Sequence, residues 1–418
     1  MTGISQTSFV HAGRRNLARR GVHVPSIDLS TTYPFSDLDQ ATKSLDRMAL
    51  GDEPVGNSIY ARLHNPTVAL FEEAIAEVEF GEAAVAFGSG MAAITAVLMA
   101  VKARGKSHIV AIRPLYGGTD HLLAAGLSGL EVTFAEPSDV VEACRDDTGL
   151  VILETPANPT LDLVDIESVV RSVCGVPVLV DSTFATPVLQ NPLLHGAALV
   201  MHSATKYIGG HGDVMGGVIV ADGEWAGRLR QVRILTGALL HPLAGYLLHR
   251  GLQTMPIRVQ SAQAGAQLIA ERLNDDSRVW DVAYPGLAGQ GGGLVGPGKQ
   301  MRGAGSMIAF RVKGGYEAAK TLLESVELIT PAVSLGSVDT LIQHPAGLTH
   351  RIVSDESKEG SHIEPDLLRL AVGIETPEDI WNDLDRALDR AARSSRNDPV
   401  RTPPRRERKK ASTIAAKR

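Results

Sequence analysis

Apolar residues follow two alternating spacings along most of this chain. Between positions 66 and 79, Leu70, Ile75 and Val78 recur at the helical period and predict an amphipathic helix. Short unbroken apolar runs stand between such stretches, and each is typical of a buried strand. Strands that alternate with helices favour an α/β fold with a mostly parallel central sheet covered by helices. The predicted strands are 83–87, 108–112, 131–134, 150–153, 176–180, 197–201 and 217–221.

The same pattern divides the chain into parts. Residues 1–60 lack a clear period and predict an extended arm with one short helix at 38–50. A long helical stretch at 241–274 predicts a link from the central sheet to a smaller α/β domain. In that domain we expect strands at 307–312, 326–329 and 368–372, a glycine-rich loop at 289–298 and a closing helix at 377–393. The predicted division is an arm (1–60), a large domain (61–258), a small domain (259–396) and a tail (397–418).

Composition narrows the classes of protein. With 418 residues, of which 44% are hydrophobic and 21% charged, the chain is long enough for two cores. A formal net charge of −6 gives no reason to expect nucleic acid or an anionic membrane as the partner of the folded body. Two cysteines, no leader sequence and no apolar run of membrane length fit a reduced cytoplasmic setting. The basic tail predicts a disordered, solvated segment, and binding of nucleic acid or acidic lipid is the alternative.

Lys206 carries the strongest chemical signal. It lies in the glycine- and hydroxyl-rich segment 202–217, between two apolar runs, with Ser203 and Thr205 close by. A lysine in such a place can be neutralised and aimed at a bound carbonyl, which is what a Schiff-base lysine for pyridoxal phosphate (PLP) requires. The alternative is a surface lysine in a turn, which is common.

Three further positions fit a PLP site. Strand 176–180 ends in Asp181, where a carboxylate points into the crevice in which parallel sheets bind ligands. There it would pair with the pyridine nitrogen, and its alternative role is a helix N-cap. The Gly88–Met91 turn, before the helix predicted at 92–103, can cradle a phosphate with backbone N–H groups, although glycine also suits a tight turn. Tyr116 is placed to stack on the pyridine ring, or is an ordinary half-buried tyrosine.

These residues belong to a series of motifs that resembles a known family. The chain is similar, over about residues 8–395, to the Cys/Met-metabolism group of PLP enzymes: methionine γ-lyase, cystathionine γ-lyase, cystathionine γ-synthase and the O-acyl-homoserine sulfhydrylases. The resemblance implies the aspartate-aminotransferase-like fold (fold type I) with a smaller α/β C-terminal domain. The motifs are Tyr60-Ala61-Arg62, Asn65-Pro66-Thr67, Ser89-Gly90-Met91, Tyr116-Gly117-Gly118-Thr119, those at 154–160, 180–184 and 203–207, Ser334-Leu335-Gly336 and that at 369–375.

The resemblance also implies roles for these residues. Lys206 would carry PLP and shuttle protons, Asp181 would pair with the pyridine nitrogen, and Arg369 would bind the substrate α-carboxylate. In this family Tyr60 and Arg62 reach the phosphate of the neighbouring subunit, which implies a site shared across a dimer and a tetramer of two dimers. No metal is implied. The other expected cofactor contacts are Ser89, Gly90, Met91, Thr183, Ser203, Thr205 and Tyr116, which would also assist proton transfer; the other substrate contacts are Ser334, Asn158, Tyr60 and Val333.

The core motifs serve both γ-elimination and γ-replacement, so the reaction is judged from peripheral positions. Family members that act on cystathionine carry acidic residues where this chain has Val333 and Ile59, and cystathionine γ-lyase carries an arginine where it has His121. The charged far end of a substrate such as cystathionine would find fewer oppositely charged side chains at these positions. We therefore expect γ-elimination on methionine or a similar γ-substituted L-amino acid, giving a 2-oxo acid, ammonia and the leaving group.

Several alternatives stay open. They are γ-replacement on O-acetyl- or O-succinyl-homoserine, a cystathionine γ-lyase, and a specialised secondary-metabolite γ-lyase. The last is favoured by Gly118 where methionine γ-lyases usually have cysteine, by Arg233-Ile234 where they have Lys-Asp, and by a long segment at 43–57. A binding protein that has lost catalytic activity is disfavoured, because Lys206, Asp181 and Arg369 are all present.

Overall fold

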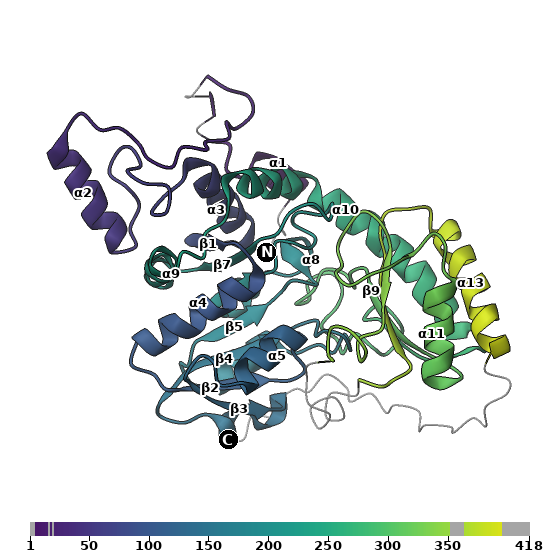
Figure 1. The fold of residues 1–418 in the computed structure, drawn as a ribbon. Coiled ribbons are helices and arrows are strands. Elements are labelled where there is room, and N and C mark those ends of the chain that lie inside the picture. Colours follow the sequence, from purple (N-terminus) through teal and green to yellow (C-terminus); the bar gives the residue numbers. More distant parts are fainter. Residues whose placement is uncertain (1–4, 16, 19–20, 352–362, 395–418) are drawn as a thin grey trace.

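Two β-sheets organise the chain (Figure 1). The computed structural model describes residues 5–15, 17–18, 21–351 and 363–394, so the tail predicted at 397–418 lies outside the described residues. Within these ranges the larger sheet has seven strands in the order β1-β7-β6-β5-β4-β2-β3. The smaller sheet has five strands in the order β10-β11-β12-β9-β8.

The large sheet confirms the mostly parallel arrangement predicted from the sequence. Strands β3, β2, β4, β5 and β6 are mutually parallel, and β7 runs antiparallel to both of its neighbours, β1 and β6. Every predicted strand of this sheet is present, with shifts only at the ends. The bounds are β1 (Ala83–Phe87), β2 (His108–Ile112), β3 (Glu131–Ala135), β4 (Thr148–Glu154), β5 (Val178–Asp181), β6 (Leu199–His202) and β7 (Gly217–Ala221).

Helices cover both faces of this sheet, which explains the unbroken apolar runs. Along β7, Val218 and Val220 pack in one core with α3 and α10, whereas Ile219 packs on the opposite face with α4 and α9. This alternation follows from the two-residue period of a strand. The helices are α3 (Pro66–Glu79), α4 (Gly90–Ala103), α5 (Gly117–Ala124), α6 (Val140–Ala143), α7 (Ile166–Ser172), α8 (Thr186–Leu189) and α9 (Gly223–Thr236), with 3-10 turns η2 (Pro137–Asp139) and η3 (Pro192–His195).

One long helix, α10 (Pro242–Asp275), joins the two sheets, as the sequence predicted. Its first half packs through Leu248 and Met255 in the core of the large sheet. Its second half packs through Ile269 and Leu273 in the core of the small sheet, together with α11 (Gly315–Ser325) and α13 (Pro377–Ser394). The helix runs across the middle of the molecule between these parts (Figure 1). Within the described ranges, no helix combines the length and apolar character that a membrane span needs.

The small sheet contains one correction to the sequence analysis. The strand predicted at 326–329 is wrong, because the N–H groups of Glu327, Leu328 and Ile329 donate to the carboxylate of Asp383 in α13 instead of to a neighbouring strand. The ladder begins only at Thr330. The strands are β8 (Val279–Ala283), β9 (Met307–Val312), β10 (Thr330–Pro331), β11 (Leu341–Gln343) and β12 (Leu367–Ala371), of which β8, β10 and β11 were not predicted.

In the described part of the N-terminal segment there are two α-helices, α1 (Gln6–His11) and α2 (Leu38–Ala49). The helix predicted at 38–50 is therefore confirmed, and α1 was not predicted. Asp37 caps α2 by accepting from the N–H of Gln40. Figure 1 shows α2 standing away from the body of the molecule. It is tied back to α9, where Arg230 and Gln231 donate to the carbonyl groups of Gly51 and Leu50.

Candidate active site

The carboxyl ends of β4, β5 and β6 open onto a cavity of about 430 Å³. This is the position at which open α/β sheets bind ligands, and the volume is typical of a small-molecule site. The structure brings together here residues from both sheets and their loops. Of the residues singled out in the sequence, the cavity wall contains Ser89, Gly90, Met91, Tyr116, Asn158, Asp181, Thr183, Ser203, Thr205, Lys206, Val333, Ser334 and Arg369.

Lys206 lies just beyond the end of β6 and points at Ser334. Its Nζ donates to Ser334 Oγ at 2.7 Å. Burial lowers the pKa of the Lys206 amine from 10.5 to about 8, and the nearby charge of Arg369 adds to this effect. An amine with such a pKa loses its proton readily near neutral pH and becomes nucleophilic. The alternative of a surface lysine is excluded by this burial.

Asp181 ends β5, the strand next to β6. One of its carboxylate oxygens accepts from both the N–H (3.0 Å) and the hydroxyl (2.6 Å) of Thr183, and that hydroxyl accepts from the N–H of Ser203 (2.9 Å). Burial raises the pKa of Asp181, while the bonds from Thr183 oppose the rise. The helix that follows, α8, begins only at Thr186 after Ala185, so Asp181 is not its N-cap. A partly buried carboxylate of this kind favours a cation beside it.

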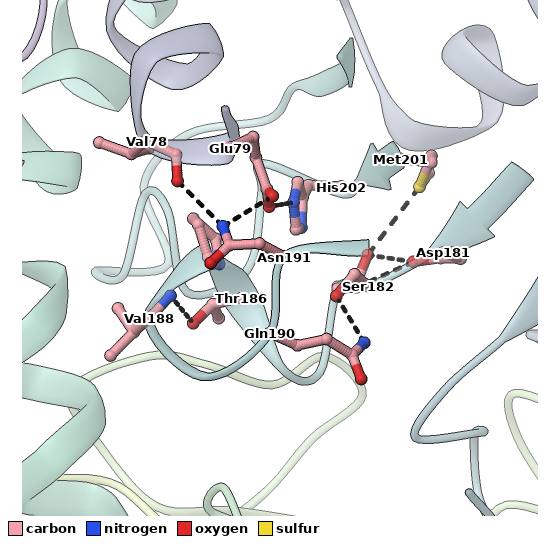
Figure 2. A network of polar contacts seen from close by, with 12 residues as sticks. Val78, Glu79, Asp181, Ser182, Thr186, Val188, Gln190, Asn191, Met201 and His202 are labelled. Carbon is pink, nitrogen blue, oxygen red and sulfur yellow. Dashed lines mark hydrogen bonds and ion pairs between the residues drawn. The ribbon is translucent and has the colours of Figure 1, made fainter. Parts of the chain in front are cut away.

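A buried polar network holds the end of β6 from the other face of the sheet (Figure 2). His202 Nε2 lies 2.5 Å from a carboxylate oxygen of Glu79, the last residue of α3. The other carboxylate oxygen of Glu79 accepts from the Asn191 amide at 3.0 Å. Because His202 directly precedes Ser203, this network fixes the backbone from which the segment to Lys206 starts.

The first turn of α4 forms a cradle at the cavity wall. Ser89 is the N-cap and accepts from the N–H of Ala92 at 3.1 Å. A Cβ at Gly90 would lie 2.8 Å from a methyl of Met201, and a Cβ at Gly217 would lie 2.3 Å from the carbonyl of Ser89. Glycine is therefore required at Gly217, where the contact is with backbone, whereas at Gly90 the flexible end of Met201 would have to shift. Since first-turn N–H groups lack partners within their helix, this end of α4 suits an anion such as a phosphate.

Arg369, on β12, is part of the cavity wall. It is 2% exposed, and its guanidinium donates to Asn158 Oδ1 at 2.8 Å and to the carbonyl of Ser334 at 2.6 Å. Burial lowers the pKa of Arg369 to about 10. Among the described residues, no carboxylate lies within ion-pair distance of this guanidinium. A buried guanidinium without a carboxylate partner is suited to bind the carboxylate of a substrate.

The sequence analysis gave no role to Glu154 and Gln343, two polar residues at this site. Glu154 lines the cavity as the last residue of β4, directly beside Asp181 in the strand register. Its place at the end of a buried strand was a usable signal, the same one that identified Asp181. Gln343 stands opposite Arg369 in the β11–β12 register, and its amide oxygen, turned toward the guanidinium, accepts from it at 2.9 Å. Nothing in the sequence indicates that pairing.

Tyr60 and Arg62 lie outside the cavity wall of this single chain. Tyr60 is 43% exposed, and the Arg62 guanidinium stacks over its ring at 5.6 Å while donating to the carbonyl of Ile234. The two side chains are therefore held together at the surface.

The residues of the cavity fit pyridoxal phosphate. An easily neutralised lysine suits the aldehyde, a partly buried carboxylate suits the ring nitrogen, and the first-turn N–H groups of α4 suit the phosphate. The mostly parallel sheet, the smaller second sheet and this site define a PLP-dependent enzyme of fold type I. The chain belongs to the Cys/Met metabolism PLP-dependent enzyme family, whose sequence profile matches residues 6–389.

The chain is also similar to individual members of this family. It is 54% identical over 387 residues to a protein named L-methionine gamma-lyase from Brevibacterium aurantiacum, covering 92% of this chain and 94% of the relative. A crystal structure of cystathionine gamma synthase from Xanthomonas oryzae pv. oryzae, in complex with aminoacrylate and cysteine, is 35% identical with a TM-score of 0.84, covering 94% of this chain and all 100% of that chain. A crystal structure of cystathione gamma lyase from Micromonospora echinospora is 37% identical with a TM-score of 0.81, covering 93% and 100%.

Proposed function

We propose that this enzyme catalyses γ-elimination on L-methionine, converting it with water into 2-oxobutanoate, ammonia and methanethiol. The observation that carries the proposal is the cavity itself, which is lined by Lys206, by Arg369, which has no carboxylate partner among the described residues, and by an apolar outer wall. That wall contains Met215, Val333 and Leu348. A methylthio group is easily desolvated against such a wall, whereas a second charged group is not. The relatives named L-methionine gamma-lyase support the same substrate.

The roles of the site residues follow from their positions. Lys206 would hold the cofactor covalently through its amine, and Asp181 would pair with the ring nitrogen. The first turn of α4, with Gly90, Ser203 and the neighbouring hydroxyl groups, would hold the phosphate. Tyr116 would lie against the ring. When bound, the cofactor supplies an electron sink for the pair left at Cα after a proton is removed.

The chain's own residues would bind the substrate and move its protons. Arg369, held by Asn158, would bind the α-carboxylate and fix the orientation of Cα. Once the substrate amine has displaced it from the cofactor, the neutral Lys206 amine would accept the Cα proton at Nζ and release protons later in the reaction. In the structure this Nζ donates to Ser334 Oγ, which would help to orient it. The Tyr116 hydroxyl would donate a proton to the departing thiolate. These steps use groups that already line one cavity.

We also propose that two chains share each site. Tyr60 and Arg62 are held together at the surface away from their own cavity, which is where a pair that serves a partner's phosphate would lie. The proposed assembly is a dimer of this kind, paired into a tetramer. The division into a large domain (61–258) and a small domain (259–396) is likewise a proposal, supported by the two sheets. Two free cysteines support a cytoplasmic setting.

The second candidate function is γ-replacement, favoured by the structural similarity to a cystathionine gamma synthase. A product assay separates the two. Purified enzyme with PLP is given L-methionine, L-cystathionine or O-acetyl-L-homoserine, each with and without sulfide. Formation of 2-oxobutanoate and methanethiol from methionine without sulfide is the expected result. Homocysteine formed only from the acyl ester with sulfide would establish γ-replacement instead, and no product from methionine would overturn the proposed substrate.

A further inference from the structure

Glu154 is the cavity residue whose role is not explained so far. It is 6% exposed and ends β4, with its Cα paired to that of Asp181 in the neighbouring strand. Among the described residues it has no ion-pair partner within 4 Å. Its two carboxylate oxygens accept instead from two backbone N–H groups: Oε2 from Tyr116 at 2.6 Å and Oε1 from Asn158 at 2.8 Å.

The two residues that donate to Glu154 come from different loops and face different parts of the cavity. Tyr116 precedes α5, where it is the N-cap residue without a side-chain capping bond, and its ring lines the cavity. Asn158 lies in the loop after β4, and its side chain accepts from the guanidinium of Arg369. The Glu154 carboxylate therefore fixes the backbone at Tyr116, whose ring lines the cavity. It also fixes the backbone at Asn158, whose amide oxygen orients Arg369.

We propose that Glu154 is a positioning residue that couples the two halves of the site, holding the Tyr116 ring against the cofactor and the Asn158–Arg369 pair against the substrate carboxylate. The inference rests on the proposed function for the identity of the two ligands. It follows from geometry: if either oxygen stops accepting, one loop loses its anchor while the other keeps it. Hydrogen bonds from N–H to a carboxylate are stronger than neutral ones, so the loss would be felt.

The surroundings of Glu154 make its anchoring sensitive to pH. The groups that face it are Asp181 from β5, Arg369 from β12, and the two N–H groups already named. Burial and the neighbouring Asp181 raise the pKa of Glu154 well above its usual range, while the two N–H groups and Arg369 oppose the rise. Below this raised pKa the side chain gains a proton and its oxygens become weaker acceptors. Anchoring should therefore weaken as the pH falls.

The test uses Glu154→Gln, which keeps the size of the side chain but turns one of its two acceptors into a donor facing an N–H group. Apoenzyme is titrated with PLP at a series of pH values, followed by absorbance, and kcat and KM for L-methionine are measured on the loaded enzyme. We expect the dissociation constant for PLP to rise about tenfold, as loss of one charged hydrogen bond predicts, and its increase at low pH to become smaller, leaving only the part that protonation of Lys206 causes. KM for L-methionine should also rise, because a less firmly held Asn158 would orient Arg369 less well for the substrate carboxylate.

Asp383 provides a matched control. It is also buried, and it also anchors a loop by accepting from backbone N–H groups, those of residues 327–329, but it does not line the cavity. Asp383→Asn should lower the melting temperature and leave the PLP dissociation constant and its pH dependence unchanged. Glu154→Asp keeps the charge but reaches one N–H group only, and it replaces Glu154→Gln if that variant does not fold. We expect it also to bind PLP more weakly than the wild type.

Two results would overturn the proposal: wild-type PLP affinity and pH dependence in both Glu154 variants, or the same loss of PLP affinity in Asp383→Asn. The PLP titration does not involve methionine. If the wild-type enzyme fails to act on methionine, the proposed function fails while the titration still decides the role of Glu154.

Discussion

The amine of Lys206 donates a 2.7 Å hydrogen bond to the hydroxyl of Ser334, a residue 128 positions later in the chain. Ser334 has a φ of 97°, in the left-handed region that favours glycine, and its carbonyl accepts from Arg369 at 2.6 Å. One residue in an unfavourable backbone conformation thus contacts both the lysine and the guanidinium. Such conformations cost about 1–3 kcal/mol and persist where the surroundings hold them, commonly at active sites.

Two substitutions of Ser334 separate the hydroxyl from the backbone strain. Ser334→Ala removes the hydroxyl but keeps a side chain at positive φ, whereas Ser334→Gly removes both. We expect both variants to lower kcat by about tenfold through loss of the bond to Lys206. In urea unfolding, Ser334→Gly should be more stable than Ser334→Ala by about 1 kcal/mol. Equal stability of the two variants would show that the conformation carries no cost.

The lowered pKa of Lys206 predicts how the apoenzyme captures PLP as the pH changes. Only the neutral amine attacks an aldehyde, so the rate constant should rise about tenfold per pH unit below pH 8 and level off above it. Because the Arg369 charge contributes to the lowering, Arg369→Met should shift the midpoint upward. Stopped-flow absorbance measures the rate, and Lys206→Ala is the control without capture. A midpoint near the ordinary value of 10.5 would contradict the burial argument.

The sequence predicts the large sheet well because its signals are local. An unbroken apolar run is enough to place a strand that is buried on both faces, as in β2 and β7. Asp181 was recognised because it follows a predicted strand, and the structure places it beside β6, the strand that leads to Lys206. Arg369 was assigned to the site only through the family resemblance. It lies far along the chain from Asp181 and Lys206, and no local pattern connects it to them.

Features that depend on distant contacts were not predictable in the same way. Residues 326–329 have the composition of a strand, but Asp383, far along the chain, takes their N–H groups. Gln343 has no signal of its own, since its role depends on the pairing of β11 with β12. Glu154 is intermediate, because its place at a strand end is local while its two partners are not.

Gln343 predicts a selective effect on substrate binding. Gln343→Glu would place a carboxylate against Arg369, where it would compete with the carboxylate of the substrate. We expect KM for L-methionine to rise at least about tenfold with kcat nearly unchanged, the pattern that marks a loss of binding common to the ground and transition states. Gln343→Leu, which removes the acceptor without adding charge, should raise KM less. A fall in kcat with constant KM in the glutamate variant would contradict this role.

Val333 predicts a change of substrate preference. The side chain is 52% exposed at the cavity wall beside Ser334, so a glutamate there would remain hydrated and reach the outer part of the cavity. Val333→Glu should lower kcat/KM for L-methionine by about tenfold, because an apolar methylthio group would have to desolvate a carboxylate. It should raise kcat/KM for L-cystathionine up to about fivefold, since an exposed pair with the distal ammonium contributes at most about 1 kcal/mol. Val333→Gln has the same shape without the charge and should show the loss but not the gain; equal values for cystathionine in the two variants would refute an electrostatic cause.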